Sequence, residues 1–284
     1  MTEIRNTDAA APSALLELAG VHKYFNRGTL SEVHALRDVS LSIAKGEFIV
    51  VVGQNGSGKS TLLQAIAGSY APEVGTLHLN GIDITHWPDF RRARFIARVF
   101  QDPFTGTAAG LSIAENFAIA SRRGIRRGLG RALNARLRSD IAARCRALGL
   151  GLEERLDVPI GTLSGGQRQA LTLLMAVWQQ PEILLLDEHT SALDPRSAEL
   201  IIRLSKEIVT DAAITTLMVT HSLQDAINLG DRLIMMHRGR VVHDVSGADK
   251  RHLRVPDLMH WFDELRQIDQ FDESTADFMR RAYV

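Results

Sequence analysis

Two glycine-rich segments and one pair of carboxylates are the parts of this chain whose residue types and spacing could do chemistry. The first segment, residues 53–60, reads Gly-Gln-Asn-Gly-Ser-Gly-Lys-Ser, which fills the pattern of a phosphate-binding loop. Its glycines let backbone N–H groups turn inward, Lys59 neutralises the outer phosphates, and Ser60 can ligate magnesium. This segment predicts a site for a nucleoside triphosphate with magnesium.

The carboxylate pair, Asp187 and Glu188, directly follows the apolar run 183–186. Acids that end a strand are just as often turn residues or helix caps. Beside a phosphate loop, however, the first acid can hold a water of the magnesium shell while the second faces an attacking water. His221 ends another apolar run and could contact the terminal phosphate, although a lone histidine there is more often a packing residue.

The second glycine-rich segment, residues 163–167, reads Leu-Ser-Gly-Gly-Gln and precedes a helical pattern. Ser164, Gly165 and Gly166 would leave free N–H groups at the start of that helix, where the helix dipole is positive. The segment therefore predicts a second anion-binding site.

Short apolar runs predict the sheet that positions these motifs. Residues 48–52, 183–186 and 214–219 are apolar almost throughout, as parallel strands covered on both faces are. Residues 39–43 and 76–79 instead alternate apolar and polar side chains, which predicts a half-exposed antiparallel sheet.

Helices are expected directly after the buried strands, over residues 59–67, 195–210 and 222–229. Strands and helices then alternate as in an α/β core. Asp194-Pro195 supplies a cap and a first-turn proline for the second of these helices. Asn80-Gly81, after the alternating run, predicts a tight hairpin turn.

The chain divides into a core domain, residues 14–248, with additions at both ends. Residues 104–166 are rich in alanine, leucine and arginine without strand patterns, which predicts an inserted helical subdomain. Residues 1–13 are expected to form a flexible tail, and residues 249–284 a helical appendage. Apolar residues recur at helical spacing over residues 255–268, so this helix docks on its own core or contacts another subunit.

Composition limits the partners and the location. The chain has 284 residues, of which 33 are basic and 33 acidic, so no overall field would hold it on nucleic acid or lipid. Its apolar runs are far shorter than the roughly 18 to 20 residues that span a bilayer. One cysteine, Cys145, and a start without a signal-peptide pattern favour the cytosol.

Together these motifs resemble the ATP-binding cassette family, the ATPase subunits of ABC transporters, and the likeness extends from about Leu16 to Ser246. By this resemblance residues 163–167 are the family signature and residues 191–194 the D-loop. Gln101 is the Q-loop glutamine and His221 the switch histidine. In residues 21–25, Phe25 is favoured over Tyr24 as the aromatic that stacks on adenine, although either ring could be core packing.

The resemblance implies a set of site residues. They comprise, as catalytic residues, Glu188, His221, Lys59 and Gln101; as nucleotide-binding residues, Phe25, Gly53, Gln54, Asn55, Gly56, Ser57, Gly58, Lys59, Ser60, Thr61, Ser164, Gly165, Gly166, Gln167 and Asp194; and as metal-binding residues, Ser60, Gln101 and Asp187.

The resemblance also implies the fold and the assembly. We expect a P-loop NTPase core of the α/β class, with an antiparallel β subdomain and an inserted α-helical subdomain. Two subunits, expected as a homodimer, would enclose ATP and Mg²⁺ between one phosphate loop and the partner's signature. The pair would bind integral membrane permease subunits, and a substrate-binding protein indirectly, at the cytoplasmic face of the inner or plasma membrane, without nucleic acid.

One residue departs from the family pattern, because His189 stands where most members have proline after the glutamate. With residues 101–106 and 232–237, it makes the chain similar to ATPase subunits of tryptophan/tyrosine-type amino-acid importers. We therefore expect an importer of amino acids or similar small solutes. The alternatives are the ATPase of an exporter, and a soluble cassette ATPase of iron-sulfur assembly, repair or translation.

An arginine-rich stretch in the helical insert faces the membrane subunits in this family and could lie near anionic headgroups, although a solvated face is the default interpretation. Its members are Arg122, Arg123, Arg126, Arg127, Arg131, Arg136 and Arg138.

Overall fold

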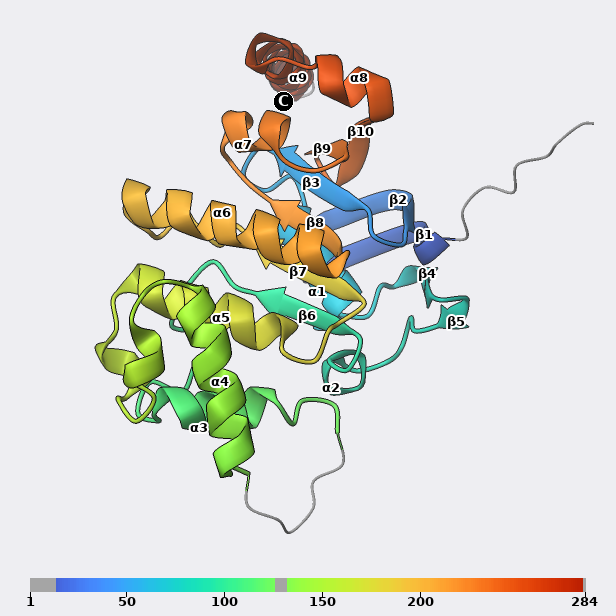
Figure 1. Cartoon of the computed structure of the whole chain (residues 1–284). Helices are drawn as coiled ribbons and strands as arrows, with labels where there is room; N and C mark the ends of the chain where they lie inside the picture. The colour runs from blue at the N-terminus through green and yellow to red at the C-terminus, as the bar shows by residue number, and fades with distance from the viewer. Residues whose placement is uncertain (1–13, 126–131, 283–284) are drawn as a thin grey trace, which may run out of the picture.

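The computed structural model of the chain describes residues 14–125 and 132–282, with side chains up to residue 270. The expected tail, residues 1–13, lies outside the described residues, as do Arg126, Arg127 and Arg131. Figure 1 shows two sheets at the centre, flanked by helices. This arrangement is the α/β fold with an antiparallel sheet and inserted helices that the sequence predicts.

The six-stranded sheet is the predicted parallel sheet, extended by strands that the sequence did not mark. In their order across the sheet, its strands are β10 (Arg240–Ser246), β9 (Arg232–His237), β3 (Phe48–Gly53), β8 (Thr215–Val219), β7 (Ile183–Asp187) and β6 (Ile96–Val99). Every pair is parallel except β10 with β9. The three predicted runs, β3, β8 and β7, lie side by side within it.

Alternate side chains of these strands enter two separate cores. In β3, Val50 and Val52 belong to one core, and Ile49 and Val51 to the other. Each such buried aliphatic side chain contributes roughly 1.5–3 kcal/mol of hydrophobic free energy. Because both faces of the strands are covered, the sheet holds the loops at its strand ends on a rigid support.

The four-stranded sheet is antiparallel, with strands β2 (Val33–Ala44), β1 (Ala14–Phe25), β4 (Val74–Leu79) and β5 (Ile82–Asp83) in that order. The two predicted alternating runs lie in β2 and β4, but β1 separates them and pairs with both. Asn80 and Gly81 have φ of 50° and 73°, so the predicted hairpin turn is confirmed.

Helices follow the buried strands as predicted. Ser222 caps α7 through its Oγ, and Asp194 caps α6 by accepting a hydrogen bond from the Ser197 N–H. The described helices are α1 (Lys59–Ala67), α2 (Asp89–Arg92), α3 (Ile113–Ala120), α4 (Ala135–Ala147), α5 (Gly165–Val177), α6 (Pro195–Ala212), α7 (Leu223–Asn228), α8 (Gly247–His252) and α9 (Val255–Ala282), with short 3₁₀ turns at Leu152–Glu154 and Ile160–Thr162.

Arg92 ties α1 to the four-stranded sheet. Its side chain is almost completely buried, at 1% exposure. It donates to the carbonyls of Ala65 and Ile66 at the end of α1, and to those of Ile84 and Thr85 after β5. Burial lowers the pKa of this guanidinium to about 10. A cation at a helix C-terminus also offsets the helix dipole, so Arg92 fixes the helix that begins at the phosphate loop.

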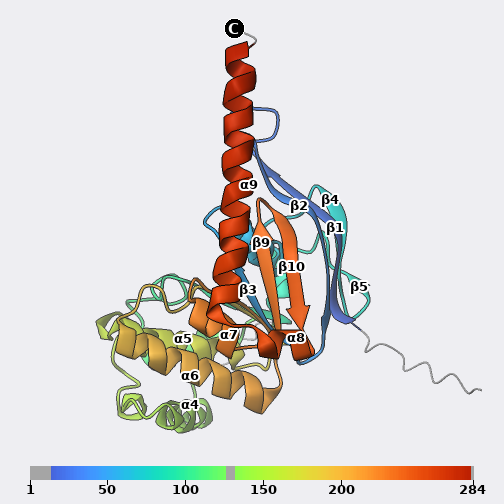
Figure 2. The same cartoon turned by 90° about the horizontal axis from the view of Figure 1, so that it is seen from above.

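The C-terminal helix α9 is longer than the predicted span of residues 255–268. Leu258 and Leu265 are buried in the core, and Trp261 stacks on His243 with 4.2 Å between ring centroids. The expected docking on the chain's own core is therefore confirmed for this part. Figure 2 shows α9 continuing beyond β9 as one unbroken helix towards the C-terminus.

Within the described residues, no helix combines the length and the apolar character needed to cross a membrane.

Candidate active site

Three adjacent strands end at the same edge of the six-stranded sheet and carry the predicted chemistry. The phosphate loop links β3 to α1, Asp187 ends β7, and His221 follows β8. Because these strands are parallel neighbours in the order β3-β8-β7, their carboxyl ends meet, and such an edge is where α/β sheets bind ligands. The fold thus brings together residues that are far apart in the sequence.

The phosphate loop is closely packed against neighbouring backbone. A Cβ at Gly53 would collide with the carbonyl oxygen of Met236, so only glycine fits there. The Lys59 ammonium donates to the carbonyls of Gly53 and Gln54 at 2.8 and 3.0 Å. Burial lowers the pKa of Lys59, and the charges of Glu188 and Asp187 oppose that shift.

Two polar atoms of this loop are buried without a hydrogen-bond partner: Ser57 Oγ and Gln54 Nε2. Buried polar groups are nearly always hydrogen-bonded in native proteins. Unsatisfied donors at a glycine-rich helix start fit a ligand with many acceptor oxygens, as a polyphosphate has.

Ser60 and Asp187 lie in direct contact across the site. The Ser60 hydroxyl donates to Asp187 Oδ1 at 3.1 Å, and the other carboxylate oxygen, Oδ2, accepts from the Arg98 guanidinium at 2.6 Å. A hydroxyl and a carboxylate are oxygen ligands of the kind that magnesium takes alongside phosphates and water. The donor set therefore fits Mg²⁺, whereas Arg98 was not expected at this carboxylate.

Glu188 and His221 form a second contact beside the first. Glu188 Oε1 lies 2.6 Å from His221 Nε2, and the carboxylate is largely buried while the imidazole is half-exposed. Glu188 has a left-handed backbone, with φ of 46°, and its N–H donates to the Val219 carbonyl of β8. A strained backbone held this way is characteristic of functional sites.

His189 is completely buried behind this pair. Its Nε2 is 2.9 Å from the Ser205 hydroxyl of α6, and that hydroxyl itself donates to the Ile201 carbonyl. Since the hydroxyl proton is used there, His189 must donate, which makes it a neutral Nε2–H tautomer. Burial lowers the pKa of His189 to about 4. This geometry supports the interpretation of His189 as a packing residue rather than a proton-transfer group.

Gln169 of α5 joins two of the loops at the site. Its side-chain amide is completely buried and donates to the carbonyls of His189, at 2.8 Å, and Phe100, at 3.1 Å. Phe100 directly precedes Gln101, and His189 directly follows Glu188. One side chain of the signature helix thus positions the backbone beside two predicted site residues.

The signature segment, residues 163–167, forms the start of α5. Ser164 and Gln167 form a reciprocal capping box at the start of α5, with both hydrogen bonds at 3.3 Å. A Cβ at Gly166 would come within 2.6 Å of Ser197 Oγ. The segment therefore packs against the start of α6, and Ser164 itself is exposed.

The remaining predicted residues are placed at the margins of the site. Gln101 is exposed in the bend after β6. Asp194 is engaged as the cap of α6, and the hydrogen bonds from Ser197 lower its pKa. At the end of β1, Phe25 meets Tyr70 edge-on at 5.2 Å, whereas Tyr24 stacks on His34 at 3.9 Å.

Sequence reasoning missed Arg98 and Gln169. For Arg98 a signal was present, because it is the one charged residue of the four in β6. A charge in a strand with buried neighbours needs a partner. For Gln169 no signal in the sequence distinguishes a buried glutamine from an exposed one on a helix.

This fold, with a phosphate loop between a central strand and a helix, is that of a P-loop ATPase. The family model described as ABC transporter matches residues 36–191, more than half of the chain. The chain belongs to the ATP-binding subunits of ABC transporters, and it is an ATP hydrolase that couples this reaction to transport.

Several relatives resemble the chain over most of its length. A tyrosine transport ATP-binding protein of Clostridioides difficile is 38% identical over 249 residues, which is 88% of this chain and 99% of that protein. A lipoprotein-releasing system ATP-binding protein of Caulobacter vibrioides is 34% identical over 81% of this chain and 96% of its own length. A methionine import ATP-binding protein of Cupriavidus metallidurans is 34% identical, covering 80% of this chain and 64% of the relative.

Solved structures agree with the fold. An ATP-binding cassette in a dimeric post-hydrolysis state with ADP and phosphate superposes with a TM-score of 0.70 at 28% identity, covering 81% of this chain and 98% of that one. The ADP conformation of another cassette gives 0.69 at 26% identity, over 84% and 92% of the two chains.

Proposed function

We propose that this chain drives import of amino acids, and that ATP is cleaved with Mg²⁺ at the edge formed by β3, β8 and β7. The observation that carries the chemistry is the pair of contacts Ser60–Asp187 and Glu188–His221. Two oxygen ligands for a metal lie beside a carboxylate that is 2.6 Å from a potential acid, the His221 imidazole. Nothing in this arrangement requires a further cofactor.

Lys59 and the loop amides would bind the phosphates. The Lys59 ammonium now donates to two carbonyls and would exchange them for phosphate oxygens, which also compensate its charge in a buried site. Ser60 Oγ and Asp187 would hold magnesium, which when bound neutralises charge on the transferred phosphoryl group. Ser57 Oγ and Gln54 Nε2 would gain the acceptors that they lack.

Glu188 would orient the attacking water and accept its proton. His221 holds the Glu188 carboxylate at 2.6 Å and would swing to the terminal phosphate when nucleotide enters. Gln101 would complete the metal surroundings, and Phe25 would stack on adenine. The left-handed backbone at Glu188 aims its carboxylate away from the strand direction.

A second copy of the chain would supply the signature. Ser164, Gly165 and Gly166 lie at the start of α5, and Ser164 is exposed there. The anion seat at that helix start therefore fits the phosphates bound to a partner. A related cassette is dimeric after hydrolysis, and we propose a homodimer whose seam contains two ATP molecules.

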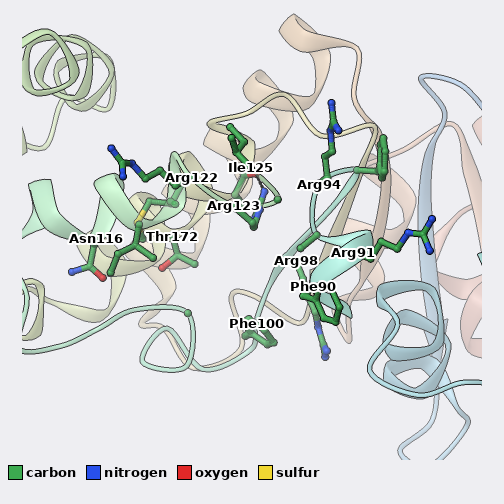
Figure 3. A pocket seen from close by; sticks show the side chains of 18 of the residues that line it. Phe90, Arg91, Arg94, Arg98, Phe100, Asn116, Arg122, Arg123, Ile125 and Thr172 are labelled. Carbon is green, nitrogen blue, oxygen red and sulfur yellow. Dashed lines mark hydrogen bonds between the residues drawn. The ribbon is translucent and has the colours of Figure 1, made fainter. Parts of the chain in front are cut away.

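A groove between the helical insert and the neighbouring elements α2, β6 and α5 would receive the permease. It has a volume of about 940 Å³ and is lined by residues from α2, β6, α3 and α5. Figure 3 shows Arg91 and Arg94 on one side, Arg122 and Arg123 on the other, and Arg98 with Phe100 between them. A cavity of this kind fits a short amphipathic segment, and it would hold the chain at the cytoplasmic membrane face. The core domain of residues 14–248 would make these contacts through its helical insert.

The substrate class rests on likeness. The tyrosine transport relative matches nearly end to end, and a methionine import relative also matches. Both favour amino acids as the cargo, carried by a permease and delivered by a binding protein. The lipoprotein-releasing relative favours the second candidate, the ATPase of an export or extraction system.

Purification from the native membrane in mild detergent, through a tag on this chain, tests the proposal. We expect an integral permease to copurify, and ATPase activity in nanodiscs to rise when a binding protein loaded with tyrosine is added. Copurification with a lipoprotein-extracting membrane subunit would reject import. Association only with soluble proteins would reject a transport role.

A further inference from the structure

Arg98 lies between the predicted metal site and the groove. It is on β6, in register with Leu185 of the neighbouring strand β7, which ends at Asp187. The neighbours Ala97 and Val99 are completely buried in the core. Arg98 thus comes from a rigid strand, and its side chain reaches from a packed sheet to two different polar surroundings.

The first of these surroundings is the Asp187 carboxylate. The guanidinium donates to Oδ2 at 2.6 Å, while Oδ1 accepts from Ser60. Both partners of this ion pair are largely buried, with 14% and 9% of the side chains exposed. Charges interact strongly where water is excluded, so Arg98 neutralises the acid that the magnesium ion would use.

The second of these surroundings is the groove. Arg98 lines it together with four further arginines, and none of the described lining residues is acidic. The Arg98 guanidinium lies over the Phe100 ring at 4.7 Å, and its Nε is buried without a hydrogen-bond acceptor. A buried donor without a partner favours an incoming acceptor, and the surrounding positive charge selects an anionic one.

We propose that Arg98 is a positioning residue that forms an ion pair with Asp187 until a carboxylate of the docked permease binds its guanidinium instead. The inference rests on the proposed function, because it names how the permease acts on this site. In the free subunit Arg98 competes with magnesium for Asp187. In the complex, the permease carboxylate that lies in the groove accepts the hydrogen bonds of the guanidinium. Asp187 is then free to bind the metal.

Binding of Mn²⁺, as a paramagnetic substitute for Mg²⁺, tests this directly. The free subunit is loaded with a non-hydrolysable ATP analogue, and free Mn²⁺ is followed by electron paramagnetic resonance. We expect Arg98→Met to tighten Mn²⁺ binding about tenfold, and Arg98→Lys to give a smaller change because the charge is kept. Arg138→Met is the control, because it removes an arginine–aspartate pair, Arg138–Asp157, outside the site.

Unchanged or weaker Mn²⁺ binding by Arg98→Met, with normal binding of the analogue and a normal melting temperature, would overturn the proposal. The purified complex gives the second arm. We expect the wild type to bind Mn²⁺ about tenfold more tightly in the complex than alone, and Arg98→Met to bind equally in both. Equal wild-type affinities in both forms would refute the coupling. If no permease copurifies, the proposed function fails, while the free subunit still reports on Arg98.

Discussion

At the residue scale, Glu188 is the side chain on which hydrolysis depends most. We expect Glu188→Gln to bind ATP normally and to lose at least about 100-fold in turnover, because an amide cannot accept the proton of the attacking water. Steady-state phosphate release and a fluorescent-nucleotide titration measure the two effects. Glu182→Gln, at the residue directly before β7, is the matched control. If Glu188→Gln turned over ATP at nearly the wild-type rate, Glu188 would not be the residue that accepts the proton of the attacking water.

His189, one residue further, makes stability depend on pH. Its pKa is lowered to about 4 from an unfolded value of about 6.5, so the unfolded chain binds a proton first as the pH falls. Above the pKa of the unfolded chain, the neutral His189 costs the folded state nothing. As the pH falls from that pKa towards the lower pKa of the folded chain, the free energy of unfolding decreases. When the pH falls from about 7 to about 5, the free energy of unfolding of the wild type should decrease by about 2 kcal/mol more than that of His189→Gln.

Urea unfolding of the two proteins at both pH values measures this difference. All other ionisable groups are common to both proteins, so their contributions cancel in the comparison. Equal losses in wild type and variant would show that His189 is not held neutral in the folded chain.

At the element scale, the buried strands and the helices that follow them could be predicted, because continuous apolar runs and capping residues are local signals. Which strands lie next to each other in the sheet could not be predicted from the sequence. Arg98 and Asp187 are 89 positions apart, and they meet only because β6 and β7 are neighbours in the sheet. The sequence predicts residues 249–284 as a helical appendage, whereas the apolar spacing indicates a helix only over residues 255–268, so the full extent of α9 (Val255–Ala282) does not follow from that spacing.

The helix α9 supports the phosphate loop through one turn. Asp269 accepts from His237 at 3.0 Å and from Arg238 at 2.8 Å. The next residue, Gly239, donates its N–H to the Ser57 carbonyl of the loop at 2.9 Å. Because Gly239 directly follows the ion-paired residues and hydrogen-bonds to the loop, α9 restrains the nucleotide site from outside it.

We therefore expect Asp269→Ala to weaken ATP binding by about two- to fivefold, which corresponds to about 0.5–1 kcal/mol and is the usual size for a part-exposed ion pair. Nucleotide titration and thermal melting measure the effect. Asp263→Ala is the control, since Asp263 is exposed and pairs with Arg266 of the same helix. If both variants bind ATP equally, α9 does not restrain the loop.

At the scale of the whole molecule, each chain carries one phosphate loop and one signature segment, which begin two different helices, α1 and α5, and we propose that the signature serves a partner's phosphate loop. Ser164→Arg should therefore leave the fold and nucleotide binding intact but prevent ATP-dependent dimerisation, because a long cation fills the seat meant for the partner's phosphate. Light scattering of the variant in the Glu188→Gln background, with ATP, reports the assembly. Ser112→Arg is the matched control, because Ser112 caps α3 through the same kind of capping box and either substitution costs about 1 kcal/mol. A Ser164→Arg protein that still dimerises with ATP would show that the signature does not form the seam.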